Sequence, residues 1–250
     1  MFYPAEPELL QGAVRFFLDA AAGGGEAPKA IIAPHAGYIY SGPIAASAYK
    51  RLLPVRSVVS RVVLLGPAHR VGFRGLAVST ADAFATPIGD VPLDRESIAK
   101  ILQLPQVAAI DRAHEQEHSL EVHLPFLLEV LERFRLVPVV VGQASPEEVE
   151  EVLEHLWGGS ETLIVVSSDL SHYHEYSVAR QLDTATSEAI VALAPERIDY
   201  DGACGRLPIA GLLRAASRRG LRAELLDQRN SGDTAGTKDR VVGYGAYAFH

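Results

Sequence analysis

The chain has 250 residues, of which 48% are hydrophobic and 22% charged, and this is the composition of an ordinary globular protein. Its net charge of -8 argues against nucleic acid or an anionic membrane surface as a partner, because both attract clusters of Lys and Arg. No stretch approaches the roughly 18 to 20 apolar residues that a membrane-spanning helix needs.

The start of the chain and its cysteine content favour a cytoplasmic protein. The segment MFYPAEPELL lacks the basic start and the apolar run of a secretory signal. The single cysteine, Cys204, cannot form an internal disulfide, which fits a reducing compartment. Its thiol therefore belongs either to the core or to a chemical site.

Hydrophobic patterns predict alternating helices and strands. Apolar residues recur at helical spacing over residues 6–21, before the glycines at 23–25. Short apolar runs predict strands at residues 29–34, 61–66, 136–142 and 163–167. Helical patterns occupy residues 43–53, 95–102, 124–134, 146–156, 177–193 and 209–218. Two closing strands are expected at residues 221–226 and 241–249.

This order of elements defines the fold class. Strands that alternate with helices predict a layered α/β fold with a mostly parallel or mixed central sheet and helices on both faces. The segment 82–91 is the only candidate domain boundary, and its signal is too weak to divide the chain. We therefore interpret residues 1–250 as one domain. In such sheets, ligands bind beyond the carboxyl ends of the strands.

Three predicted strands end in loops that carry a histidine. His35 follows the first run, His69 follows the second, and His172 follows the run at 163–167. A lone histidine in a loop is more often a simple hydrogen-bonding group, so it is the occurrence of three such histidines together that indicates a site. Converging imidazoles are what Fe(II), Cu or Zn requires, and Asp169 could orient a ligating ring through a hydrogen bond.

Cys204 lies just before a predicted helix. Backbone N–H groups and the helix dipole lower the pKa of a thiol at such a position, which favours a metal ligand or a nucleophile. The alternative is a buried and inert thiol, a common fate of a free cysteine. The local sequence does not decide between these two roles of the Cys204 thiol.

The segment HEQEH at residues 114–118 offers a competing metal site. It matches both H-E-x-x-H and H-x-x-E-H, which on a buried helix would put His114 and His118 on one face for zinc. Its polar neighbours and the nearby Pro125 argue against a long helix. We interpret the segment as a solvated loop, with a zinc hydrolase as the less favoured alternative.

Two further polar segments carry weaker signals. Residues 230–240, NSGDTAGTKDR, lack the Gly-Lys-[Ser/Thr] ending of a P-loop and a strand-to-helix setting, so we expect a connection between the closing strands. The serines Ser167, Ser168 and Ser171 lie near histidines, but no Gly-x-Ser-x-Gly elbow supports a serine hydrolase.

Several of these segments resemble one family in their order along the chain. APHAGYIYSG, LLGPAHR, EHSLEVHLPF, VVSSDLSHYH and CGRLPIAGLL resemble the signature segments of the Memo family. The closing NSGDTAGTKDRVVGYGAYAF resembles its bacterial and archaeal branch. The resemblance covers nearly the whole chain, and five ordered motifs make it specific.

The resemblance implies a fold and a metal site. The Memo family is similar in fold to class III extradiol dioxygenases of the LigB type, which hold non-haem Fe(II) on two histidines and a carboxylate. Memo-like proteins replace the carboxylate by cysteine. Carried over to this chain, the ligands would be His35, His69 and Cys204. His172 would line the cleft as the counterpart of a catalytic acid/base.

The resemblance also places His118 and His123 in a family motif, as possible neighbours of the pocket. It implies a metal-dependent oxidoreductase of unknown substrate that uses Fe(II), with Cu or Zn as alternatives, and in which His172 and Asp169 are the catalytic side chains. Thiolate in place of a hard carboxylate argues against ring cleavage. The alternative is a non-catalytic metal- or peptide-binding protein that works with AMMECR-type and radical-SAM partners.

Overall fold

The computed structural model describes residues 2–250 and contains a mixed sheet of nine strands and a separate two-stranded hairpin. The strands are β1 (Ala30–Ala33), β2 (Arg61–Pro67), β3 (Leu76–Val78), β4 (Ala83–Thr86), β5 (Gly89–Pro92), β6 (Val107–Ala109), β7 (Arg135–Val141), β8 (Thr162–Ser167), β9 (His172–His174), β10 (Ala223–Asn230) and β11 (Val241–Phe249). The helices are α1 (Pro7–Ala20), α2 (Tyr38–Tyr49), α3 (Arg95–Ile101), α4 (His118–Glu121), α5 (Leu124–Val130), α6 (Pro146–Leu156), α7 (Tyr176–Val191) and α8 (Arg206–Arg218), with 3-10 turns η1 (Lys50–Val55), η2 (Asp111–Ala113), η3 (Pro195–Arg197) and η4 (Ser231–Asp233).

The middle of the large sheet is parallel and its flanks are antiparallel. The strand order is β10-β11-β1-β8-β2-β7-β3-β6, and β9 pairs with β11. Strands β1, β8, β2 and β7 run parallel to one another, whereas β11 is antiparallel to β1 and β3 is antiparallel to β7. The central strands are buried almost throughout, because helices cover both faces.

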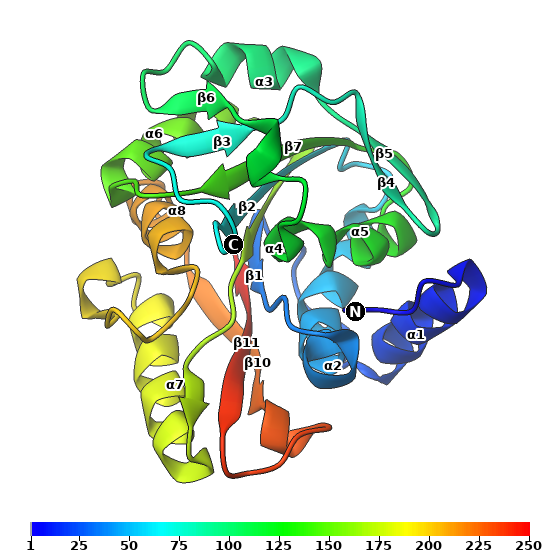
Figure 1. Cartoon of the computed structure of the whole chain (residues 1–250), viewed down its shortest axis with the longest axis vertical. Coiled ribbons are helices and arrows are strands. Elements are labelled where there is room, and N and C mark those ends of the chain that lie inside the picture. The colour runs from blue at the N-terminus through cyan, green and yellow to red at the C-terminus, as the bar shows by residue number, and fades with distance from the viewer. Residues whose placement is uncertain (1) are drawn as a thin grey trace.

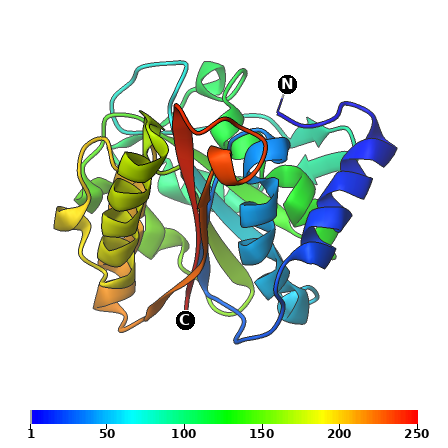
Figure 2. The ribbon, with the colours of Figure 1, turned by 90° about the horizontal axis from the view of Figure 1, so that it is seen from below.

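Helices form a layer on each side of this sheet (Figure 1). Helices α1, α2 and α5 pack together on one face, and α6 and α8 pack together on the other. Figure 2 shows α7 on one side of strands β10 and β11 and helix α2 on the other, and α1 lies beyond α2. The predicted layered α/β fold with a mixed sheet is therefore confirmed.

Local sequence explains most of these elements. Helix α1 buries Leu10, Val14 and Leu18, which recur every four residues and form one apolar stripe. Helix α6 begins with a capping box, in which the Ser145 hydroxyl accepts from Glu148 N–H and the Glu148 carboxylate accepts from Ser145 N–H. None of the helices in residues 2–250 is long and apolar enough to cross a bilayer.

Some predicted boundaries were wrong. Helix α2 begins at Tyr38 and not at residue 43, because the Gly37 carbonyl accepts the first N–H groups of the helix and Pro43 removes only one bond from it. The helix predicted to reach residue 134 ends at Val130. The first closing strand runs over Ala223–Asn230 and not over residues 221–226, because it follows the register of β11.

A buried carboxylate joins α7 to the loop that follows β8. Asp183 is 2% exposed, and its Oδ1 accepts from Ser171 N–H at 3.0 Å. Ser171 and Leu170 also exchange backbone hydrogen bonds with Gly243 of β11. A Cβ on Gly243 would lie 2.1 Å from Asp183 Oδ2, so only glycine permits this close approach. The loop is thus fixed between α7 and β11.

Asp183 should make stability depend on pH. Burial raises its pKa from 3.8 to about 6, so the unfolded chain ionises this group more easily than the folded chain does. The stability that the neutral acid contributes is complete below pH 3.8 and is lost as pH rises through about 6. We expect Asp183→Asn to avoid this loss, so that the variant gains about 2 kcal/mol relative to wild type between pH 4.5 and pH 7.5.

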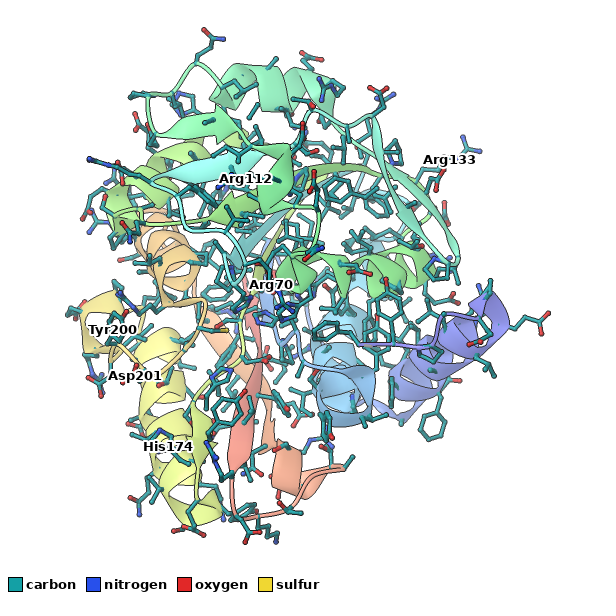
Figure 3. All side chains as sticks on the ribbon, viewed as in Figure 1. Arg70, Arg112, Arg133, His174, Tyr200 and Asp201 are labelled. Atoms are coloured by element: carbon teal, nitrogen blue, oxygen red, sulfur yellow. The ribbon has the colours of Figure 1, made fainter. Side chains whose placement is uncertain are left out.

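Urea unfolding at the two pH values measures this gain. The matched control is Asp201→Asn, because Asp201 is exposed and projects from the surface in Figure 3. Its stability difference from wild type should be the same at both pH values. An equally constant difference for Asp183→Asn would contradict the prediction.

Candidate metal site

Parallel strands bring the predicted histidine loops together. Strand β8 pairs in parallel with β1 on one side and β2 on the other, so the carboxyl ends of all three strands meet at one edge of the sheet. His35, Asp169 and His69 each lie two residues beyond the end of β1, β8 and β2, respectively. Arg70, which follows His69, lies near the middle of the face seen in Figure 3.

Three histidines form a cluster at this edge. His35, His69 and His118 each offer a ligand atom within 4.8 Å of the other two. The ring centroids are 5.1 Å apart for His35 and His69, 5.5 Å for His35 and His118, and 4.8 Å for His69 and His118. Among the residues that the structure describes, these three form the group whose ligand atoms lie close enough together to hold one metal ion.

The His35 ring is held by a chain of buried hydroxyl contacts. The Ser167 hydroxyl donates to the Ser119 carbonyl at 2.5 Å, so its oxygen is free to accept from His35 Nδ1–H at 2.6 Å. This arrangement leaves the lone pair on His35 Nε2. Burial lowers the pKa of His35 well below its ordinary value, and the ring is therefore neutral, as a metal ligand must be.

The carboxylate of Glu117 holds His69. Its Oε1 lies 2.9 Å from His69 Nδ1 and accepts from Ser119 N–H at 3.0 Å, while its Oε2 accepts from His69 N–H at 2.6 Å. Burial acts to raise the pKa of Glu117, but the hydrogen bonds from His69 and Ser119 outweigh it and lower the pKa to about 2. Glu117 is therefore a carboxylate at neutral pH.

His118 lies between two other rings. It stacks on His69 with an interplanar angle of 18°, and Phe2 stacks on it at a centroid distance of 4.3 Å with an angle of 9°. Burial lowers the pKa of His118 to about 4, so this imidazole is neutral as well. Phe2 is held over the cluster by its carbonyl, which accepts from Tyr38 N–H at 2.8 Å.

The Cys204 thiol lies beside the cluster. Its Sγ is 3.4 Å from His35 Nε2 and accepts from Asp169 N–H at 3.3 Å. Bonds of about 2.1 Å to nitrogen and about 2.3 Å to sulfur place two ligands of one tetrahedral ion about 3.6 Å apart. The thiol therefore lies at a suitable distance from His35. Burial raises the pKa of Cys204 to about 12, contrary to the lowering expected before a helix, since desolvation outweighs the helix N-terminus.

A glycine allows the cysteine loop to approach the end of β8. A Cβ on Gly205 would lie 2.6 Å from the Ser167 carbonyl oxygen and 2.7 Å from Ser168 Cβ. Gly205 N–H donates to the Ser168 hydroxyl at 2.9 Å, and Cys204 N–H donates to the Asp169 carbonyl at 3.3 Å. These contacts fix Cys204 against the same edge as the histidines.

Asp169 supports the first histidine through the backbone. Its Oδ1 accepts from His35 N–H at 2.8 Å, and its Oδ2 lies 4.0 Å from His35 Nε2, which is beyond hydrogen-bonding distance. Burial raises the pKa of Asp169 to about 7. Asp169 therefore orients the loop of His35 and does not hold a ring nitrogen.

The two remaining predicted histidines lie outside the cluster. His172 is on β9, half-buried, and its ring packs against Tyr173. His123 is 1% exposed, and its Nδ1 pairs with the Tyr49 hydroxyl at 2.7 Å. Burial lowers the pKa of His123 to about 3, and its ring is part of the core between α2 and α5.

The structure divides the HEQEH segment. η2 ends at Ala113 and α4 begins at His118, so no helix places His114 and His118 on one face. The His114 ring packs against Phe84 at 5.7 Å and is not in the cluster. The interpretation as a solvated loop was wrong for Glu117, which is 4% exposed. Its carboxylate accepts from the backbone N–H groups of His69 and Ser119 and lies 2.9 Å from His69 Nδ1.

Sequence reasoning missed the role of Glu117 and ranked His118 only as a pocket neighbour. The one available signal was their place in the segment EHSLEVHLPF, directly before an apolar run. Cys204 as the third ligand stays a prediction, and the residue that the structure groups with His35 and His69 within 4.8 Å is His118.

The fold and this site define a single-domain α/β protein with a histidine cluster and a cysteine at the carboxyl ends of parallel strands. The chain belongs to the Memo family, since the family model described as Memo-like protein matches residues 1–248.

Curated relatives agree with this assignment. A MEMO1 family protein of Ignicoccus hospitalis is 35% identical and covers 99% of this chain and 95% of its own length. A MEMO1 family protein of Aquifex aeolicus is 38% identical, with coverage of 87% and 84%. A MEMO1 family protein of Archaeoglobus fulgidus is 35% identical, with coverage of 99% and 96%.

A solved structure is similar in fold. The uncharacterized protein JW3007 from Escherichia coli K12 superposes with a TM-score of 0.55 at 14% sequence identity. The match covers 86% of this chain and 98% of that chain. At this identity the likeness concerns the fold alone.

Proposed function

We propose that this protein is a metal-dependent oxidoreductase that binds Fe(II) or copper on His35 and His69. Cys204 is the proposed third ligand, and His118 is a further donor beside it. The observation that carries the proposal is the convergence of three imidazoles within 4.8 Å, with a thiol 3.4 Å from one of them. Membership of the Memo family supports it.

The donor set fits a transition metal. The Nδ1 atoms of His35 and His69 are occupied by Ser167 and Glu117, which leaves both Nε2 atoms available. Neutral imidazole and thiolate are the ligands that Fe, Cu and Zn prefer over hard cations. Such outer contacts also fix ring orientation before a metal arrives.

Bound Fe(II) or copper would supply a redox couple and open coordination positions at this edge of the sheet. The chain itself supplies the orientation of the ligands through Ser167, Glu117 and Asp169. We assign His172 to proton movement, since it is half-buried on the strand that follows the Asp169 loop. The protein would work in the cytoplasm, where Cys204 stays reduced.

Metal binding is tested with variants of two histidines. Protein purified anaerobically and titrated with Zn(II) by calorimetry should bind one ion per chain. We expect His35→Ala to weaken binding at least about 100-fold, because it removes a ligand and not merely a supporting contact. His114→Ala should bind as wild type does, since its ring lies outside the cluster. The reverse pattern would contradict this site and favour the zinc hydrolase.

The role of Cys204 is tested with cobalt. Co(II) bound to a thiolate gives a charge-transfer absorption in the near ultraviolet that imidazole ligands do not give. We expect this band in the wild type and in His118→Ala but not in Cys204→Ser. Absence of the band from cobalt-loaded wild type would show that the thiol is not a ligand.

Oxygen consumption tests the catalytic part of the proposal. Fe(II)-loaded protein with ascorbate as the reductant should consume dioxygen faster than His35→Ala treated in the same way. His172→Gln should keep its iron but lose rate, by about 100-fold if proton transfer limits the reaction. An inert protein with a full complement of iron would instead favour a non-catalytic metal-binding protein with AMMECR-type and radical-SAM partners.

A further inference from the structure

The position of Glu117 is unusual for a buried carboxylate. Its side chain is 1% exposed, and removing a charge from water is costly unless the charge is compensated. Among residues 2–250, no Lys or Arg forms an ion pair with it, and the titratable groups within 4.0 Å of its carboxylate are the imidazoles of His69 and His118. The carboxylate is therefore not explained by an ordinary salt bridge.

Its hydrogen bonds connect two elements of the histidine cluster. One oxygen lies 2.9 Å from His69 Nδ1 and accepts from Ser119 N–H at the start of α4, and the other accepts from His69 N–H in the loop after β2. The backbone bonds fix the carboxylate, so the ring of His69 must adapt to it. A carboxylate only accepts hydrogen bonds, and the ring can satisfy it only with the proton on Nδ1.

We propose that Glu117 is a positioning residue that holds His69 in the Nδ1–H tautomer and so directs Nε2 to the metal. This inference rests on the proposed metal site. The same Oε1 lies 3.5 Å from His118 Nδ1, so one negative charge lies beside two of the three clustered imidazoles. A carboxylate behind ligating rings raises their basicity and attracts a cation.

The close packing of α4 against β2 makes this arrangement possible. The Ser119 hydroxyl donates to the Pro67 carbonyl at 2.9 Å, and a Cβ on Gly66 would lie 2.8 Å from both Ser119 Oγ and Leu120 Cδ2. Glu117 therefore reaches His69 because Gly66, the second-to-last residue of β2, has no side chain. These contacts hold the start of α4 against the end of β2, next to the loop that carries His69.

Long-range 1H–15N spectra of the metal-free wild type at pH 8 test the tautomer without any substitution. We expect His69 to carry its proton on Nδ1. A proton on Nε2 would overturn the proposal whether or not the protein binds metal. This measurement therefore separates the inference from the metal site itself, which is tested by Zn(II) binding to the wild type, His35→Ala and His114→Ala.

The variant Glu117→Gln tests the consequence for metal binding. A glutamine amide cannot accept from the His69 ring and the His69 backbone on both of its atoms, so the Nδ1–H population should fall. Calorimetric titration with Zn(II) should show affinity reduced by about 10- to 100-fold. Glu115→Gln is the matched control, because Glu115 is exposed in the same segment and should keep wild-type affinity.

Two outcomes of the variant experiment decide the matter. Loss of the Nδ1–H tautomer together with weaker Zn(II) binding supports the positioning role. An unchanged tautomer and an affinity within about twofold of wild type overturn it. Circular dichroism confirms that the variant is folded, and if it is not, the wild-type tautomer still decides.

Discussion

The parallel pairing of β8 with both β1 and β2 is the constraint on which the site depends. These three strands are close to fully buried, and their hydrogen bonds fix the register of residues that are more than 100 positions apart in the chain. The residue two positions beyond the end of each strand therefore lies at the same carboxyl edge of the sheet. His35, Asp169 and His69 meet there because of backbone geometry, before any contact between their side chains is considered.

Sequence patterns could predict this part of the molecule because its signals are local. Buried strands appear as apolar runs, and a histidine directly after a run must lie at the carboxyl edge of a parallel sheet. His35 and His69 were found in this way. The short strands β3, β6 and β9 were not predicted, because a strand of three residues is too short to show a period of two.

The contribution of α4 could not be predicted from the sequence. Helix α4 has only four residues, and its position is set by the Ser119 bond to Pro67 and by the absence of a side chain on Gly66. Both contacts are tertiary. The polar residues around Glu117 and His118 are typical of a solvated segment, but the Glu117 carboxylate is buried and hydrogen-bonded in the interior. Local polarity is a poor guide where a polar group has all of its partners.

Contacts within the chain itself organise the cluster. Ser167 and Glu117 each engage one imidazole on Nδ1, and burial keeps His35 and His118 neutral. Lone pairs therefore converge without the repulsion that protonated rings would cause. Little reorganisation is then required of the protein, and this is the condition under which donor atoms give high affinity. The neighbouring thiol differs, since burial favours its protonated form.

The face-to-face stack of Phe2 on His118 has a practical consequence for handling the protein. Any peptide fused ahead of residue 2 would emerge next to the cluster, and an affinity tag rich in histidine would compete for the same ions. The other terminus is safer. His250 exchanges backbone hydrogen bonds with Arg222, and Phe249 pairs with Ala30 at the amino end of β1, on the far edge of the sheet (Figure 2). An affinity tag is therefore better placed after His250.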